Sequence, residues 1–141
     1  MEPVDFVKHN CLEENVHFPG IVTEEDKLKF LGETDIFAFP SWYPSEGPPL
    51  VILEAMSAGC PVISTKGVGV IDGLVADGVT GIFLERQNPK ELADAIIKLI
   101  EYPDVSTAMG REGRKRFEEY FTMEKNVKGM IRFFKEILAQ G

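Results

Sequence analysis

Residues 39–65 read FPSWYPSEGPPLVILEAMSAGCPVIST, and the fold class can be inferred from this segment. The apolar run at residues 36–39 ends at a proline, which indicates a strand. After a polar loop, the pattern predicts a helix from about Pro49 to Ala58 that ends at Gly59. Residues 61–65 are again apolar and predict a second strand. Strand, helix and strand in this order are typical of an α/β domain with a mostly parallel sheet.

The remainder of the chain extends this pattern. Two more apolar runs, at residues 16–18 and 81–84, bring the expected sheet to about four strands, flanked by helices in a Rossmann-like arrangement. The glycine-rich segment 67–73 is expected to be a loop too flexible to enter the core. Apolar residues at helical spacing predict further helices whose stripes pack in the core, and these follow Thr23, run over about 88–101 and 105–120, and follow Thr122.

Length and charge restrict the class of protein. The chain has 141 residues, of which 44% are hydrophobic, so one globular domain is expected. The first 85 residues carry 14 acidic and 4 basic side chains, and the last 56 carry 9 and 11. A nucleic-acid partner is therefore not expected, because phosphate binding needs a concentrated basic field.

Other features of the sequence bear on the location of the chain and on the roles of its histidines and of Cys60. No apolar run approaches the length of a bilayer span, and the first ten residues do not resemble a signal peptide, so a cytoplasmic location is expected. His9 and His17 have no partner at metal-binding or acid–base spacing. Cys60 is expected to fill a small buried space and not to act as a nucleophile.

Two glutamates in residues 39–65 are candidate functional residues. Glu46 lies just before the expected helix and Glu54 lies within it, with seven residues between them. Such pairs arise by chance, and Glu25 and Glu33 form a second one. The first pair differs because its context places it at the carboxyl ends of parallel strands, where α/β domains bind ligands.

The expected helix start suits a phosphorylated ligand. The amides of Leu50 and Val51 belong to the first helical turn, where unpaired N–H groups and the positive end of the helix dipole favour a phosphate. Glu54 lies one turn further on, and helical side chains lean toward the N-terminus, so its carboxylate can bond a vicinal diol such as that of a ribose. A ligand with a sugar, a diphosphate and a ribose in sequence fits this row of groups.

At this point the chain resembles a known family. From about Val16 to Phe134 it is similar to the C-terminal, donor-binding half of retaining glycosyltransferases of family 4, the group 1 glycosyltransferases with the GT-B fold. The resemblance rests on several motifs taken together. They are V-H-F-x-G, D-I-F-A-F-P-S, E-G-x-x-L-V-x-L-E-A-M, G-x-P-V-I-S-T, D-G-V-T-G and M-G…R…F-E-E-Y-F-T.

The resemblance implies roles for individual residues. Glu46 bonds hydroxyls of the transferred sugar, together with Gly47, and is the catalytic candidate. Glu54 bonds the ribose, and the amides of Leu50 and Val51 hold the diphosphate. The loop Gly20, Ile21 and Val22 lines the base. The substrate is a UDP-, GDP- or ADP-sugar, and neither a cofactor nor a metal ion is expected.

Some positions depart from the family pattern. The family commonly has Gly-Phe-Gly after the first glutamate, whereas here Pro48 and Pro49 follow Gly47 and have no N–H to donate. The loop before Asp72 is one residue longer than usual, so Asp72 either forms a turn or contacts the ligand. Lys66 is either a solvated residue at the strand end or a contact of the diphosphate.

Two aromatic side chains border the loop of the expected site. Trp42 and Tyr43 follow the strand at residues 36–39. Their position allows two readings, in which they stack on a sugar or pin the loop.

Relative to the family, the chain is expected to be an incomplete nucleotide-sugar-binding domain over residues 1–141. It lacks the N-terminal acceptor domain and the first two strands of the donor domain, which bring the arginine and lysine that clamp the diphosphate. The Val16–Phe18 strand therefore loses its neighbour. The open sheet edge also suggests self-association.

The function implied by the resemblance is transfer of a hexose, with retention, from a nucleoside-diphosphate sugar to a sugar or lipid-linked acceptor. The isolated chain is expected to be inactive without an N-terminal acceptor domain or partner chain, which could also place it on the cytosolic face of a membrane. The alternatives are a non-catalytic nucleotide-sugar-binding module, a subunit of a split enzyme, or a relative of the GT-B epimerases.

Overall fold

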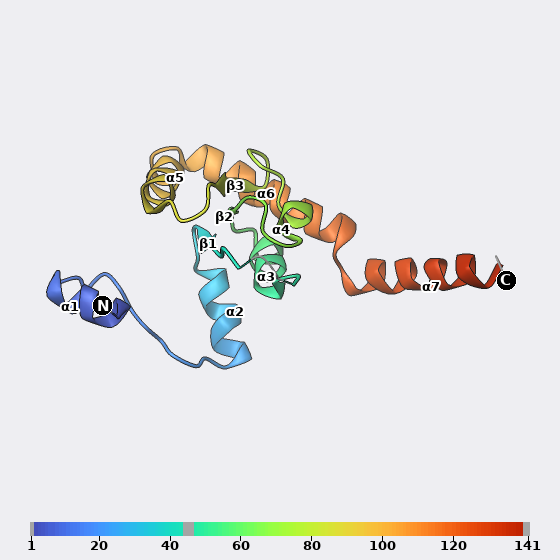
Figure 1. Cartoon of the computed structure of the whole chain (residues 1–141), viewed down its shortest axis with the longest axis horizontal. Helices are drawn as coiled ribbons and strands as arrows, with labels where there is room; N and C mark the ends of the chain where they lie inside the picture. Colours follow the sequence, from blue (N-terminus) through green and yellow to red (C-terminus); the bar gives the residue numbers. More distant parts are fainter. Residues whose placement is uncertain (1, 44–46, 140–141) are drawn as a thin grey trace. The chain divides into compact units, whose positions relative to one another are not determined.

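The computed structural model describes residues 2–43 and 47–139. The chain divides into two compact units, residues 1–30 and 31–141. Its helices and strands are drawn in Figure 1. They are α1 (Pro3–His9), α2 (Glu24–Gly32), β1 (Phe37–Phe39), α3 (Leu50–Ala58), β2 (Val62–Thr65), α4 (Ile71–Leu74), β3 (Gly81–Leu84), α5 (Pro89–Glu101), α6 (Pro103–Tyr120) and α7 (Met123–Ala139).

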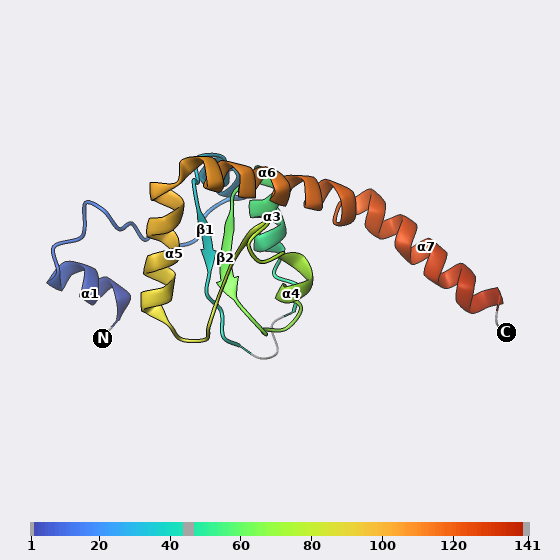
Figure 2. The same ribbon diagram turned by 90° about the horizontal axis from the view of Figure 1, so that it is seen from above.

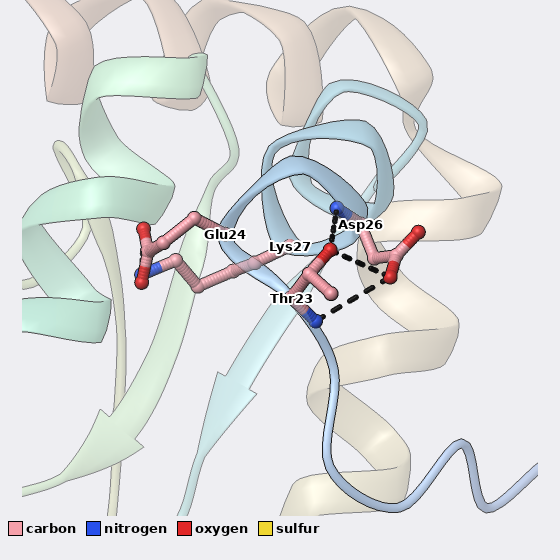
Figure 3. A network of polar contacts seen from close by, with 4 residues as sticks. All are labelled: Thr23, Glu24, Asp26 and Lys27. Atoms are coloured by element: carbon pink, nitrogen blue, oxygen red, sulfur yellow. Dashed lines mark hydrogen bonds and ion pairs between the residues drawn. The ribbon is translucent and has the colours of Figure 1, made fainter.

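The first unit contains α1 and most of α2. Figure 3 shows how α2 begins: the Thr23 hydroxyl oxygen accepts the Asp26 amide at 3.1 Å, and Asp26 Oδ2 accepts the Thr23 amide at 3.4 Å. This reciprocal cap satisfies donors that a helix start leaves open, and it confirms Thr23 as the N-cap. An exposed ion pair between Glu24 and Lys27, at 3.0 Å, bridges the same turn.

The strand predicted at residues 16–18 is wrong. These residues have no strand conformation, and the Val16 amide instead donates to the Leu12 carbonyl at 2.9 Å. Phe18 is 51% exposed. A single strand has no partner for its backbone groups, and none of the described residues pairs with this segment. The apolar pattern alone does not show whether a neighbouring strand exists to pair with these residues.

Within the described residues, the second unit is built on a parallel sheet in the order β1-β2-β3, with three strands where about four were expected. Phe37 pairs with Val62, and Val62 pairs with Gly81. The view in Figure 2 shows α5 on one side of β1 and β2, and α3 and α4 on the other. The predicted α/β class, with a parallel sheet flanked by helices, is confirmed.

The two faces of the sheet carry separate parts of the core. All four residues of β2 are buried, and successive side chains point to opposite faces. Val62 packs with Ile52 and Met56 of α3, whereas Ile63 packs with Leu99 of α5. Because both faces are covered, every position of β2 is buried, and buried residues do not alternate with exposed ones.

The helix α6 approaches the end of α3 closely. A Cβ atom at Gly110 would collide with the carbonyl oxygen of Gly59, so only glycine fits at this crossing. Gly59 ends α3 in the left-handed conformation, with φ 84°. The helix predicted at 105–120 is confirmed, and it begins two residues earlier, at Pro103.

The apolar stripe of the last helix does not pack in the core as predicted. The structure confirms the helix, and the Thr122 hydroxyl oxygen caps it by accepting the Lys125 amide at 3.3 Å. None of the residues described for α7 is buried, however, and Ile131 and Phe134 are 50% and 55% exposed. Helical spacing establishes that a helix has an apolar face, but it does not say what covers that face.

Within residues 2–43 and 47–139, no helix combines the length and the hydrophobicity that crossing a lipid bilayer requires.

Candidate functional site

The start of α3 follows β1 at the carboxyl end of the sheet. Pro49 precedes the helix and provides no side-chain cap, although its carbonyl accepts the Ile52 amide at 2.9 Å. In the described part of the chain, nothing accepts a hydrogen bond from the amides of Leu50 and Val51. These two N–H groups and the positive end of the helix dipole are available to an anion.

Glu54 lies one helical turn beyond this start. Its side chain is half-buried, and its carbonyl accepts the Ser57 hydroxyl at 2.7 Å. Positions four apart share one face of a helix, and the side chains lean toward the N-terminus. Glu54 therefore shares the face of Leu50, as its predicted role requires.

The residues just before α3 are described only in part. Glu46, predicted to contact the transferred sugar, lies outside the described residues. Gly47 is exposed and open, because a Cβ atom there would have no neighbour within 4 Å. Its role in binding the sugar stays a prediction.

The glycine-rich segment after β2 is part of the core, contrary to prediction. Val68 and Ile71 are fully buried and Leu74 is 7% exposed. The apolar side chains recur at positions 68, 71, 74 and 75, a spacing that could have identified the short helix α4. The three glycines in this segment are typical of a flexible loop, and the prediction gave them more weight than the apolar spacing.

Polar contacts fix the same segment. Asp72 Oδ1 accepts the Gly67 amide at 2.9 Å, which is the turn-forming alternative proposed for this residue. The Arg86 guanidinium donates to the Gly67 carbonyl at 2.5 Å. From α6, Arg116 donates to the carbonyls of Gly73 and Leu74, both at 2.8 Å. A role of Asp72 in ligand contact stays a prediction.

Arg86 was missed by the sequence analysis as a cation of this region. Lys66, the cation that the sequence analysis names, is exposed at the end of β2. Arg86 follows β3, and its guanidinium reaches the loop after β2. Its place directly after an expected strand was the available signal, since parallel strands end at one edge of a sheet.

The predicted base-binding residues belong to the first unit. Gly20 adopts a left-handed φ of 69°, and Ile21 is fully exposed. Val22 is at the limit of exposure, with 36%. Their contact with a base stays a prediction.

Among residues 2–43 and 47–139, no three histidine, cysteine or acidic side chains lie close enough together to hold a metal ion. The expectation that the substrate binds without a metal stays a prediction.

Comparison with known proteins identifies relatives that match most of the chain. The model of the family described as "Glycosyl transferases group 1" matches residues 5–116. The uncharacterized glycosyltransferase MJ1178 of Methanocaldococcus jannaschii is 31% identical over 133 residues, which are 94% of this chain and 36% of that protein. The capsular polysaccharide biosynthesis glycosyltransferase CapM of Staphylococcus aureus is 34% identical over 86% of this chain and 31% of its own length.

Solved structures show the same fold. A sucrose-phosphate synthase from Thermosynechococcus elongatus superposes with a TM-score of 0.84 at 28% identity, covering 98% of this chain and 34% of that one. The Anabaena protein HepE, solved with UDP and glucose, gives a TM-score of 0.81 at 26% identity, over 98% and 35%. The chain thus spans about a third of the length of these relatives. Its α/β fold is that of the GT-B glycosyltransferases.

Proposed function

Since this chain belongs to the group 1 glycosyltransferases, we propose that it is the donor-binding part of an enzyme that uses a nucleoside-diphosphate sugar. The observation that carries the proposal is the start of α3. Two unpaired amides, of Leu50 and Val51, accompany Glu54 at the carboxyl end of a parallel sheet. HepE, which has the same fold, was solved with UDP and with UDP-glucose.

Each group has a proposed task. The amides of Leu50 and Val51 bond the diphosphate, and the Glu54 carboxylate accepts both hydroxyls of the ribose. Glu46 and Gly47 contact the sugar. Pro48 and Pro49 have no N–H, so the backbone offers fewer donors to the sugar than in relatives with Gly-Phe-Gly. The base is uracil, guanine or adenine.

The proposed chemistry is mainly electrostatic. Breaking the bond between the sugar and the diphosphate leaves negative charge on the diphosphate oxygens. Amides that already point at this position stabilise that charge without reorganising. In the proposed reaction a hexose passes to a sugar or lipid-linked acceptor with retention of configuration. An N-terminal domain or a partner chain is needed to complete the acceptor site, so the 141 residues alone are expected to bind the donor without turnover.

A second candidate function is a nucleotide-sugar-binding module or a subunit of a split enzyme. The chain spans 36% of the MJ1178 glycosyltransferase and 34% of the sucrose-phosphate synthase chain. Turnover by the purified 141-residue chain, with donor and a panel of acceptors, would exclude this candidate.

Calorimetric titration with UDP, GDP and ADP tests donor binding. Replacing Glu54 by Gln removes the charge of the ribose contact with little change in shape, and we expect affinity for the preferred nucleotide to fall about tenfold to a hundredfold. Glu33→Gln is the matched control, because Glu33 occupies the same position in the chain's other pair of glutamates. Equal affinity of wild type and Glu54→Gln would remove Glu54 from the site.

A further inference from the structure

A cleft of about 360 Å³ lies at the carboxyl end of the sheet, beside α5. Pro40 and Trp42, after β1, form one wall, and the turn after β3 with the first residues of α5 forms the other. Thr65, the last residue of β2, also lines the cleft. In Figure 2, α5 lies on the side of β1 and β2 opposite to α3. None of the groups assigned to the donor lines it.

Trp42 is the largest apolar side chain among the residues that line the cleft. Trp42 is 56% exposed although it lines the cleft wall. An aromatic side chain that serves to pin a loop buries most of its area, because that burial is the source of its stabilising effect. More than half of the surface of Trp42 is instead exposed. The adjacent Tyr43, 61% exposed, does not line the cleft.

The opposite wall is polar and held in place. The Asn88 amide oxygen accepts the Glu91 amide at 3.1 Å, and Glu91 Oε2 accepts the Glu85 amide at 2.7 Å. The bond from Arg86 to the Gly67 carbonyl ties the same turn to the loop after β2. Glu85, Gln87 and Asn88 therefore stand on a fixed backbone, which limits the entropy lost when a ligand binds.

These two walls suit a neutral sugar. A pyranose ring has an apolar C–H face, which packs on an indole, and hydroxyl groups around its edge, which bond carboxylate and amide side chains. Glu85 and Gln87 supply such groups opposite Trp42. The Glu85 carboxylate repels phosphates, which disfavours a nucleotide here. The volume lies at the lower end of small-ligand pockets, as a mono- or disaccharide requires.

We propose that the cleft between Trp42 and the Glu85–Asn88 turn is a binding subsite for a neutral pyranose, separate from the donor groups on α3. Its use as the subsite of the acceptor sugar rests on the proposed function. The binding itself does not, because it depends only on the cleft.

The chain offers a direct probe of this proposal, because Trp42 is its single tryptophan. The 141-residue chain is titrated with methyl α-D-glucopyranoside and methyl α-D-mannopyranoside while the Trp42 emission is followed. We expect a saturable change in emission with at least one of them, with a dissociation constant in the millimolar range. Glycerol at matched concentration serves as the solvent control. The proposal fails if neither sugar gives a saturable change in emission, whether or not uridine gives one.

Variants locate the binding in the cleft. Gln87 has a left-handed φ of 55°, a conformation that glycine adopts readily, so Gln87→Gly removes the amide without straining the turn. We expect it to weaken sugar binding roughly fivefold to tenfold. Tyr43→Ala is the matched control and should leave affinity unchanged. Trp42→Ala, followed by saturation-transfer NMR, should abolish binding. Circular dichroism verifies that each variant folds.

The outcomes separate this subsite from the donor site. Retained affinity in Gln87→Gly, or loss of affinity in Tyr43→Ala, would refute the placement in this cleft. Loss of sugar binding with unchanged UDP binding in Trp42→Ala supports it. If the wild-type chain binds UDP and no sugar, the subsite is wrong and the proposed function stands. If the wild-type chain binds a sugar and no nucleotide, the proposed function is wrong and the subsite stands.

Discussion

The clearest contrast at the scale of residues is between the two cysteines. Cys11 is exposed, whereas Cys60 is buried and its thiol lies 3.4 Å from the Thr34 carbonyl oxygen, to which it donates. Burial raises the pKa of the Cys60 thiol, and the nearby Asp35 carboxylate raises it further. The thiolate, which is the reactive form, is therefore disfavoured at neutral pH. This agrees with the structural role that the sequence predicts for Cys60.

Thiol labelling tests this difference. At pH 7.5 we expect iodoacetamide to modify Cys60 at least about tenfold more slowly than Cys11, with single-cysteine variants Cys11→Ser and Cys60→Ser measured separately. Because the folded pKa exceeds the unfolded one, the thiol stabilises the fold below the ordinary pKa of about 8.5, and stability falls as the pH rises above it. Equal labelling rates in the native protein would contradict the burial.

In α6, the absence of a Cβ atom at a glycine decides how closely the helix can approach α3. Gly110 lies against the carbonyl of Gly59, whereas at Gly113 a Cβ atom would find its nearest neighbour at 3.8 Å, an ordinary contact. We expect Gly110→Ala to lower the free energy of unfolding by about 1–3 kcal/mol, because α6 must move away from α3.

Gly113→Ala in the same helix is the matched control. It should leave stability unchanged or raise it by up to about 1 kcal/mol, since alanine favours a helix over glycine. Urea unfolding followed by circular dichroism measures both variants. If both destabilise the protein equally, the close approach at Gly110 is not what distinguishes it.

The elements also show how far the sequence can predict the fold. Asn88 followed by Pro89 predicts the start of α5, and the Asn88 oxygen indeed accepts the Glu91 amide there. Such signals are local, so they need no knowledge of neighbours. The strand at Val16 and the core position of Ile131 fail for the opposite reason. Both depend on a partner surface, which hydrophobic periodicity does not reveal.

The candidate site follows the same division. The start of α3, and with it the placement of Leu50, Val51 and Glu54, is fixed by a local sequence pattern and could be predicted. The cleft beside Trp42 brings together the ends of all three strands, from residues 40 to 92. These segments lie far apart in the sequence, and the parallel register of the sheet brings them together. A short sequence motif therefore cannot predict the cleft.

At the scale of the whole molecule, the charge of the chain opposes its proposed ligand. The net charge is −8, and the first 85 residues, which contain the start of α3, carry 14 acidic and 4 basic side chains. A diphosphate is also negative. Local amides attract it over short range, while the field of the chain repels it over long range. Salt screens the long-range part first, because the Debye length shortens as ionic strength rises.

Salt dependence therefore distinguishes binding by amides from binding by a basic clamp. Between about 20 mM and about 200 mM NaCl, we expect the affinity of the chain for UDP to stay constant or to rise by up to about threefold, as screening removes the repulsion. Uridine, which has no phosphate, is the control and should show no salt dependence. A site clamped by cations loses affinity over the same range. A steep loss for UDP would mean that Lys66 and Arg86 dominate the binding, and that the amides of Leu50 and Val51 contribute less than proposed.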